Sequence, residues 1–203
     1  MVVRKFAWFC LASLAGLLFS SAAQAQKALM NNEVSVDGLY EFTPDSSGNG
    51  IDLHSTHSAG FAGTFSHSYH WWLGYQAGYD YARYTNYYTG QVFGIQNNQH
   101  EISGSYFVHG PHTIAGIQPF ALAGVSGLLF SPTLNGGQNV PRQWRVGVNY
   151  GVGVDIPLLT SAFGIRVQYH GVLYKAPDFG QANLTTNAWR DTSLPMAGIY
   201  FHF

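Results

Sequence analysis

Strict alternation of apolar with small or polar residues is the feature that most constrains this chain. In residues 145–156 the apolar residues share one face: Val146, Val148, Tyr150, Val152, Val154 and Ile156. The small or polar residues share the other: Arg145, Gly147, Asn149, Gly151, Gly153 and Asp155. Residues 71–82 repeat the pattern. A period of two residues is that of a two-faced β-strand. The chain is therefore predicted to be all-β.

Eight segments carry this signal, at about 33–43, 58–66, 71–84, 97–109, 117–130, 144–157, 163–174 and 193–203. The connections alternate between short ones (67–70, 110–116, 158–162) and longer ones (44–57, 85–96, 131–143, 175–192). Short turns at one end and long loops at the other are typical of transmembrane barrels. The faces of the fifth segment stay ambiguous, because Pro119 and the Ala-Gly-Val run at 123–125 indicate a bend or bulge.

Alternation alone also permits a soluble sandwich, and composition favours the barrel. The polar faces are built from Gly, Ser, Asn and Gln, and only 9% of the chain is charged, against about 25% in soluble domains. Aromatic residues lie on the apolar faces, many near strand ends, as in interfacial girdles: Tyr40, Phe42, Phe65, Trp71, Tyr79, Tyr81, Tyr169, Phe201 and Phe203. Residues 26–203 are therefore predicted to form one eight-stranded antiparallel up-and-down transmembrane β-barrel.

The first 25 residues have the pattern of a secretory signal peptide. Arg4 and Lys5 precede an apolar core at 6–19 and a small-residue tail ending Ala-Gln-Ala, so cleavage is expected before Gln26. The core is shorter than a spanning helix needs, which makes an uncleaved anchor the weaker alternative. Cleavage would leave no cysteine, and seven Lys and Arg against ten Asp and Glu. That balance disfavours a nucleic-acid partner.

The last segment carries a specific pattern. Four apolar residues alternate with Gly198, Tyr200 and His202 and finish on a terminal Phe: Ala197, Ile199, Phe201 and Phe203. This arrangement resembles the assembly signal that the barrel-insertion machinery reads in bacterial outer-membrane proteins.

The family resemblance is carried by the signal peptide, the segments 117–125, 150–155, 165–169 and 174–179, and the terminal Phe203. The whole mature chain resembles the small eight-stranded outer-membrane barrels, the OmpA-like and OmpX-like porin-family domains. The resemblance implies location in the outer membrane of a Gram-negative cell, contact with its lipid and lipopolysaccharide, and assembly by the insertion machinery. It implies activity poorly, because family members are structural proteins, adhesins, resistance factors and occasionally enzymes. We expect a structural or surface-interaction role through the long loops, which would meet any extracellular ligand. A narrow pore for small solutes is the alternative, and a lipid-modifying enzyme is a less favoured one.

Charged side chains on the inward faces should fill the lumen, because an eight-stranded barrel is just wide enough for its own side chains. The predicted lumen set is Asp37, Glu41, Asp80, Glu101, Arg145, Asp155, Arg166 and His170. Its five acids exceed its two fixed cations, so either several acids lie near the wet ends or His170 helps to neutralise them. Asp155 and Arg166 flank a short turn and are expected to pair. An ion-conducting constriction is the alternative use of this set.

The nine histidines do not form a metal motif in the sequence. His54 and His57 lie near Asp52 but lack the third and fourth ligands of a usual zinc site. His170 is placed inside a strand on the lumen side, and its neighbours Tyr169 and Gly171 supply no nucleophile suited to it. The sequence therefore predicts no catalytic residue, no cofactor, no metal site and no enzymatic activity.

Overall fold

The computed structural model describes residues 31–111, 116–160 and 162–203; the predicted signal peptide, 1–25, lies outside these residues. The strands are β1 (Asn32–Glu41), β2 (Ser46–Gly48), β3 (Ile51–Ser55), β4 (Ser58–His70), β5 (Leu73–Tyr88), β6 (Ile95–His109), β7 (Gln118–Pro132), β8 (Gln143–Thr160), β9 (Phe163–Lys175) and β10 (Trp189–His202). A short 3-10 helix, η1, covers Ala182–Leu184. In the described residues, no helix is long and apolar enough to cross a membrane.

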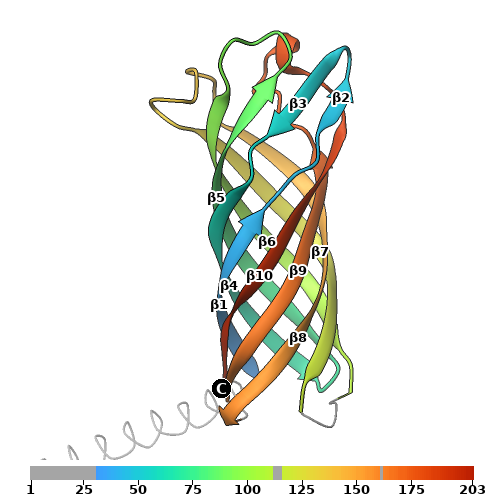
Figure 1. The fold of residues 1–203 in the computed structure, drawn as a ribbon. Coiled ribbons are helices and arrows are strands. Elements are labelled where there is room, and N and C mark those ends of the chain that lie inside the picture. The colour runs from blue at the N-terminus through green and yellow to red at the C-terminus, as the bar shows by residue number, and fades with distance from the viewer. Residues whose placement is uncertain (1–30, 112–115, 161) are drawn as a thin grey trace, which may run out of the picture.

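Eight of these strands close into a barrel (Figure 1). Each of β1 and β4–β10 pairs antiparallel with its neighbours in chain order, and β1 also pairs with β10, where Val36 lies opposite Ile199. Closure leaves the ring of these eight described strands without an open edge, which is the condition for a sheet to lie in hydrocarbon. The predicted eight-stranded antiparallel barrel is confirmed.

The two ends of the barrel differ. At the turn end, strands β1, β5, β7 and β9 begin and strands β4, β6, β8 and β10 end. The Asn32 N–H donates there to the Phe203 carbonyl at 2.9 Å. At the loop end lie the connections 42–57, 89–94, 133–142 and 176–188. The first of these holds the β2–β3 hairpin, which extends the sheet where Leu53 pairs with Tyr88. The sequence pattern assigned this hairpin to a loop because its strands are short and polar.

The fifth predicted segment corresponds to β7, and its structure corrects one expectation. Its pairings with β6 and β8 run without a register shift, so Pro119 marks no bulge. The alternation is regular, and the buried inward side chains are Phe120, Leu122, Ser126, Leu128 and Phe130. The sequence was ambiguous because both faces of β7 are apolar.

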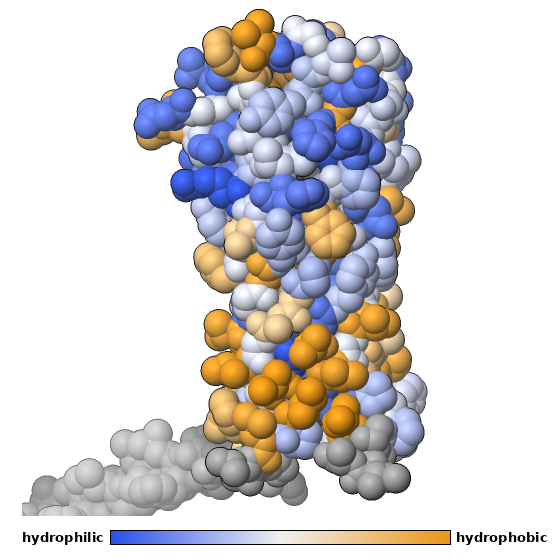
Figure 2. All heavy atoms as spheres, in the orientation of Figure 1, coloured by the Kyte–Doolittle hydropathy of each residue, from blue (hydrophilic) through white to orange (hydrophobic). Residues whose placement is uncertain are grey.

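The outer face changes character along the barrel axis. Figure 2 shows apolar residues gathered over the turn-end half of the visible face and hydrophilic residues over the loop-end half. Outward valines and isoleucines such as Val36, Val152 and Ile199 are strongly exposed. An apolar band around a barrel is what hydrocarbon requires. On this face the band therefore lies nearer the turn end, and the loop-end parts of the strands project beyond it.

Candidate functional site

The turn end of the lumen is organised around one arginine. Arg166 donates from Nε and Nη2 to the two carboxylate oxygens of Asp155, at 2.7 and 2.8 Å, and Nη2 lies 2.6 Å from Glu33 Oε1. All three residues are buried. The pair expected between Asp155 and Arg166 therefore forms. Glu33 is not among the predicted lumen residues, although it shares the parity of Asp37, because it lies at the edge of the first predicted segment.

A cavity of about 640 Å³ lies at the turn end of this network. Its lining includes Glu33, Asp155, Tyr69, Trp71 and Tyr200. Carboxylates and aromatic rings thus face a wide vestibule, and the Arg166 network forms part of its wall.

Three buried side chains form a second group, the central cluster, defined as Asp80, Glu101 and His170. Asp80 and Glu101 are direct cross-strand partners on β5 and β6, and His170 reaches them from β9. Its Nε2 lies 3.0 Å from Glu101 Oε1 and 4.0 Å from Asp80 Oδ2. The cluster therefore joins two walls of the barrel.

A chain of hydroxyl and amide groups leads from the central cluster across the lumen. Ser105 donates to the Asn149 side-chain oxygen at 2.7 Å, Asn149 donates to Ser126 Oγ at 2.7 Å, and Ser126 donates to Glu101 Oε1 at 2.6 Å. The sequence did not predict this series of hydrogen bonds, because Ser126 lies on the strand whose faces were ambiguous.

The central cluster does not have the geometry of a hydrolase triad. Nucleophilic serine and its histidine base must be in direct contact, whereas Ser126 and His170 both bond to the same Glu101 oxygen. Both are also buried. These two hydrogen bonds link β6, β7 and β9 through Glu101.

The loop-end half of the lumen is filled by an apolar plug. It is the buried cluster of Leu39, Leu53, Ala62, Ala82, Tyr84, Tyr88, Ile95, Leu128, Phe130, Val140, Val172, Tyr174, Ala176, Phe179, Leu184, Leu194 and Met196. Phe130 on β7 and Tyr174 on β9, strands that both pair with β8, have ring centroids 5.7 Å apart and no exposed surface. Side chains of this size therefore occupy the loop-end part of the interior.

Arg190 and Glu41 are buried beside this plug. Arg190 donates to Ser55 Oγ at 3.0 Å and to the Pro44 carbonyl at 3.2 Å, which fixes the β2–β3 hairpin against β10. The sequence missed Arg190, because β10 begins at Trp189 and not near 193 as predicted. Both carboxylate oxygens of Glu41 are buried and have no hydrogen-bond partner.

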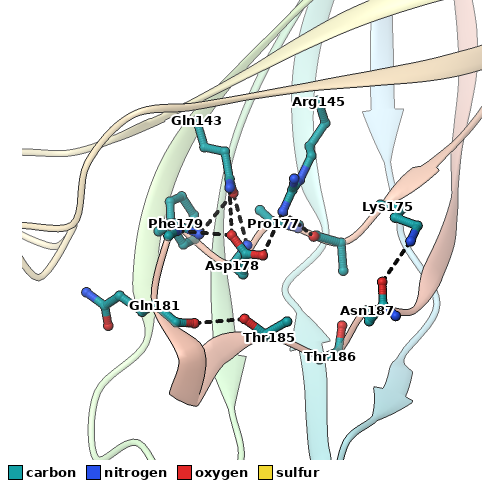
Figure 3. Close-up of polar contacts among 12 residues, drawn as sticks. Gln143, Arg145, Lys175, Pro177, Asp178, Phe179, Gln181, Thr185, Thr186 and Asn187 are labelled. Carbon is teal, nitrogen blue, oxygen red and sulfur yellow. Dashed lines mark hydrogen bonds and ion pairs between the residues drawn. The ribbon is translucent and has the colours of Figure 1, made fainter.

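A polar network fastens the loop 176–188 over the plug (Figure 3). Gln143 donates to Asp178 Oδ1 at 2.6 Å, and its own oxygen accepts from the Asp178 and Phe179 N–H groups at 2.9 Å. Arg145 lies 3.0 Å from Asp178 Oδ2. Partial burial alone would raise the pKa of Asp178, but hydrogen bonds from Gln143 and the Gly180 N–H, with the charge of Arg145, hold it below its ordinary value.

Arg145 has the inward strand parity that the sequence predicts, and its guanidinium is paired with the loop carboxylate of Asp178 and donates to the Ala176 carbonyl at the loop end. The structure places the other predicted lumen residues inside the barrel with 6% or less of their surface exposed: Asp37, Glu41, Asp80, Glu101, Asp155, Arg166 and His170. The predicted assembly residues Ala197, Ile199, Phe201 and Phe203 lie on the outer face of the turn end.

Comparisons with known proteins agree with this geometry. OprG of Pseudomonas aeruginosa superposes with a TM-score of 0.61 at 14% identity, covering 85% of this chain and 96% of its own. Neisserial surface protein A gives 0.58 at 18% identity, covering 85% and 97%. The fold is that of the small outer-membrane barrels. AlkL gives 0.52 at 11% identity, covering 86% and 90%. No protein-family model and no curated protein matches the sequence.

Proposed function

We propose that this protein is a closed barrel anchored in the outer membrane that acts as a surface-interaction protein through its loop end. The observation that carries the proposal is the apolar plug, which fills the loop-end half of the lumen where a solute path would have to continue. A narrow pore is the alternative, and the turn-end vestibule would be its entrance. The plug favours the closed anchor.

The loop end offers a surface suited to contact with a partner. Three large apolar side chains on its loops are exposed to solvent beyond the barrel: Val92, Phe93 and Leu134, at 88%, 68% and 98%. The loop that carries Leu134 is joined to the start of β6, directly after the loop that carries Val92 and Phe93: the Gln96 N–H donates to the Gly136 carbonyl at 2.8 Å and the Thr133 N–H to the Gln96 carbonyl at 2.9 Å. Exposed apolar groups on a braced scaffold indicate a contact surface.

The proposal includes no catalytic role. The His170 and Ser126 side chains are bridged by Glu101 and closed off from substrate. Assembly by the insertion machinery is also part of the proposal, with Phe203 and the outward residues of β10 as the recognised strand.

Retention of cells on an apolar support tests the surface role. Cells displaying the parent protein should be retained on octyl-coated beads several-fold more than cells carrying Val92→Ser, Phe93→Ser and Leu134→Ser together. Val125→Ser, on the lipid-facing side of β7, is the matched control and should not reduce retention of cells with equal surface levels. Equal retention of parent, triple variant and cells lacking the protein would contradict the proposal.

A further inference from the structure

The central cluster has an unbalanced charge. Asp80 and Glu101 lie directly opposite each other on neighbouring strands, an arrangement that is destabilising for like charges. Both are buried, and the described ion pairs within 4.0 Å give each of them one cationic partner, His170, which both share. One histidine can neutralise only one of two carboxylates. A buried carboxylate without compensation is costly.

One ligand atom in the cluster is also unused. Glu101 is 1% exposed, and its Oε2 has no hydrogen-bond partner. The other oxygen, Oε1, already accepts from Ser126 and lies 3.0 Å from His170 Nε2. Buried carboxylate oxygens are normally satisfied by a donor or by a cation. The second oxygen of Glu101 therefore indicates a missing positive partner.

From this geometry we propose that Asp80, Glu101 and His170 bind one divalent transition-metal ion, of which Zn²⁺ is the representative. One nitrogen and two oxygen ligands are a donor set that zinc accepts. A dication with two carboxylates and a neutral imidazole gives a net charge of zero at the site. Each of the three residues supplies one ligand atom, and these atoms lie within 4.8 Å of one another.

The distances fit a small metal ion. Ligands at about 2.0–2.2 Å from zinc are about 3.3–3.6 Å apart in a tetrahedral site. The separations from His170 Nε2 are 3.0 Å to Glu101 Oε1 and 4.0 Å to Asp80 Oδ2, and one ligand atom from each residue lies within 4.8 Å of the others. Side-chain shifts of about 1 Å would therefore bring three ligand atoms to zinc-binding separations. A void of about 10 Å³ lined by Asp80 and His170, among others, has about the volume of one water, which would complete four ligands.

The ion would cross-link strands that do not pair with each other. Asp80 and Glu101 lie on the adjacent strands β5 and β6, whereas His170 lies on β9, which shares no pairing with either. A metal bound by all three would tie the two walls of the barrel together. Because all three ligand side chains are buried, we expect the ion to enter during folding and to exchange slowly afterwards.

Metal content of refolded protein tests the site. Residues 26–203 are refolded into detergent micelles with Zn²⁺, loosely bound metal is removed with a weak chelator, and zinc per folded protein is measured by elemental analysis. The parent should retain one equivalent, and Asp80→Asn, Glu101→Gln and His170→Asn should each lose it. His54→Asn is the matched control, because His54 forms an exposed pair with Asp45 on a loop; it should keep the equivalent. Equal zinc in the parent and the three cluster variants would overturn the proposal.

A second readout needs no variant. Co²⁺ in place of Zn²⁺ should give the parent the intense visible absorption of a four-coordinate site with nitrogen and oxygen ligands. Heat-dependent gel mobility establishes that each sample is folded. A folded parent with no retained zinc and only the weak spectrum of hydrated Co²⁺ would also overturn the proposal.

Discussion

Asp155 and Arg166 form a two-pronged ion pair inside the barrel, on neighbouring strands next to the β8–β9 turn, with both residues buried. Glu33 joins the same guanidinium from β1. The arginine thus links β8 and β9, on one side of β10, to β1 on its other side. Its removal would leave two buried carboxylates without their shared cation.

Arg166→Met is therefore expected to lower the free energy of unfolding by about 3–5 kcal/mol, the cost of breaking a buried pair from one side. Urea unfolding of protein reconstituted in lipid vesicles measures this change. Adding Asp155→Asn to the variant should restore part of the loss, because it removes one of the orphaned charges. Arg142→Met, at an exposed loop position, should have little effect; a similar loss there would contradict the account.

Gly171 should not tolerate a larger side chain, because a Cβ atom there would overlap the ring of Tyr150. That ring is held by the hydrogen bond from its hydroxyl to Asp191 at 2.7 Å. Gly171→Ala is expected to cost about 1 kcal/mol, the value of such a bond, in the same unfolding assay. Gly104→Ala, where a Cβ meets nothing within 4 Å, should be neutral or slightly stabilising. Gly171→Ala in a Tyr150→Ala background should cost nothing if the overlap is the cause.

The loop 176–188 should loosen in acid. Because the pKa of Asp178 is lowered in the folded protein, its contribution to stability is present above the unfolded value of about 3.9 and is lost as the pH falls through the lower folded value. Amide hydrogen exchange of Phe179 and Gly180 should therefore stay slow, after correction for intrinsic rates, at pH 7 and become faster below about pH 4. Asp178→Asn should show fast exchange at both pH values. Slow, pH-independent exchange in the variant would contradict this role.

Phe203 is expected to act mainly in assembly. It lies on the outer face at the turn end and is 38% exposed, near the interface, where a charge costs only about 0–1 kcal/mol. Phe203→Asp should thus refold into detergent almost as well as the parent, yet insert poorly in cells. A protease-accessibility assay on intact cells, with Asn135→Asp as the loop control, measures insertion. Equal insertion of the variant and the parent would refute the assembly role.

The strands and their faces could be predicted because each inward or outward position is set by a period of two, which needs no knowledge of distant residues. The same logic placed Asp80, Glu101 and His170 on the inner wall, and the short β8–β9 turn gave the Asp155–Arg166 pair. It could not show that His170 meets two acids from the far wall, since that contact depends on the size and register of the closed barrel. Nor could it give Arg145 its partner, because Asp178 lies on a loop without periodicity.

The central claim is that the loop-end plug closes the lumen, and single-channel recording in planar lipid bilayers tests it most directly. Purified parent protein, inserted in parallel with a channel-forming barrel as positive control, should produce no discrete current steps at either polarity. We expect no current because large side chains pack together inside the barrel around Phe130 and Tyr174. Steady, ion-selective single-channel steps from the folded parent would contradict the closed anchor and establish the narrow pore in its place.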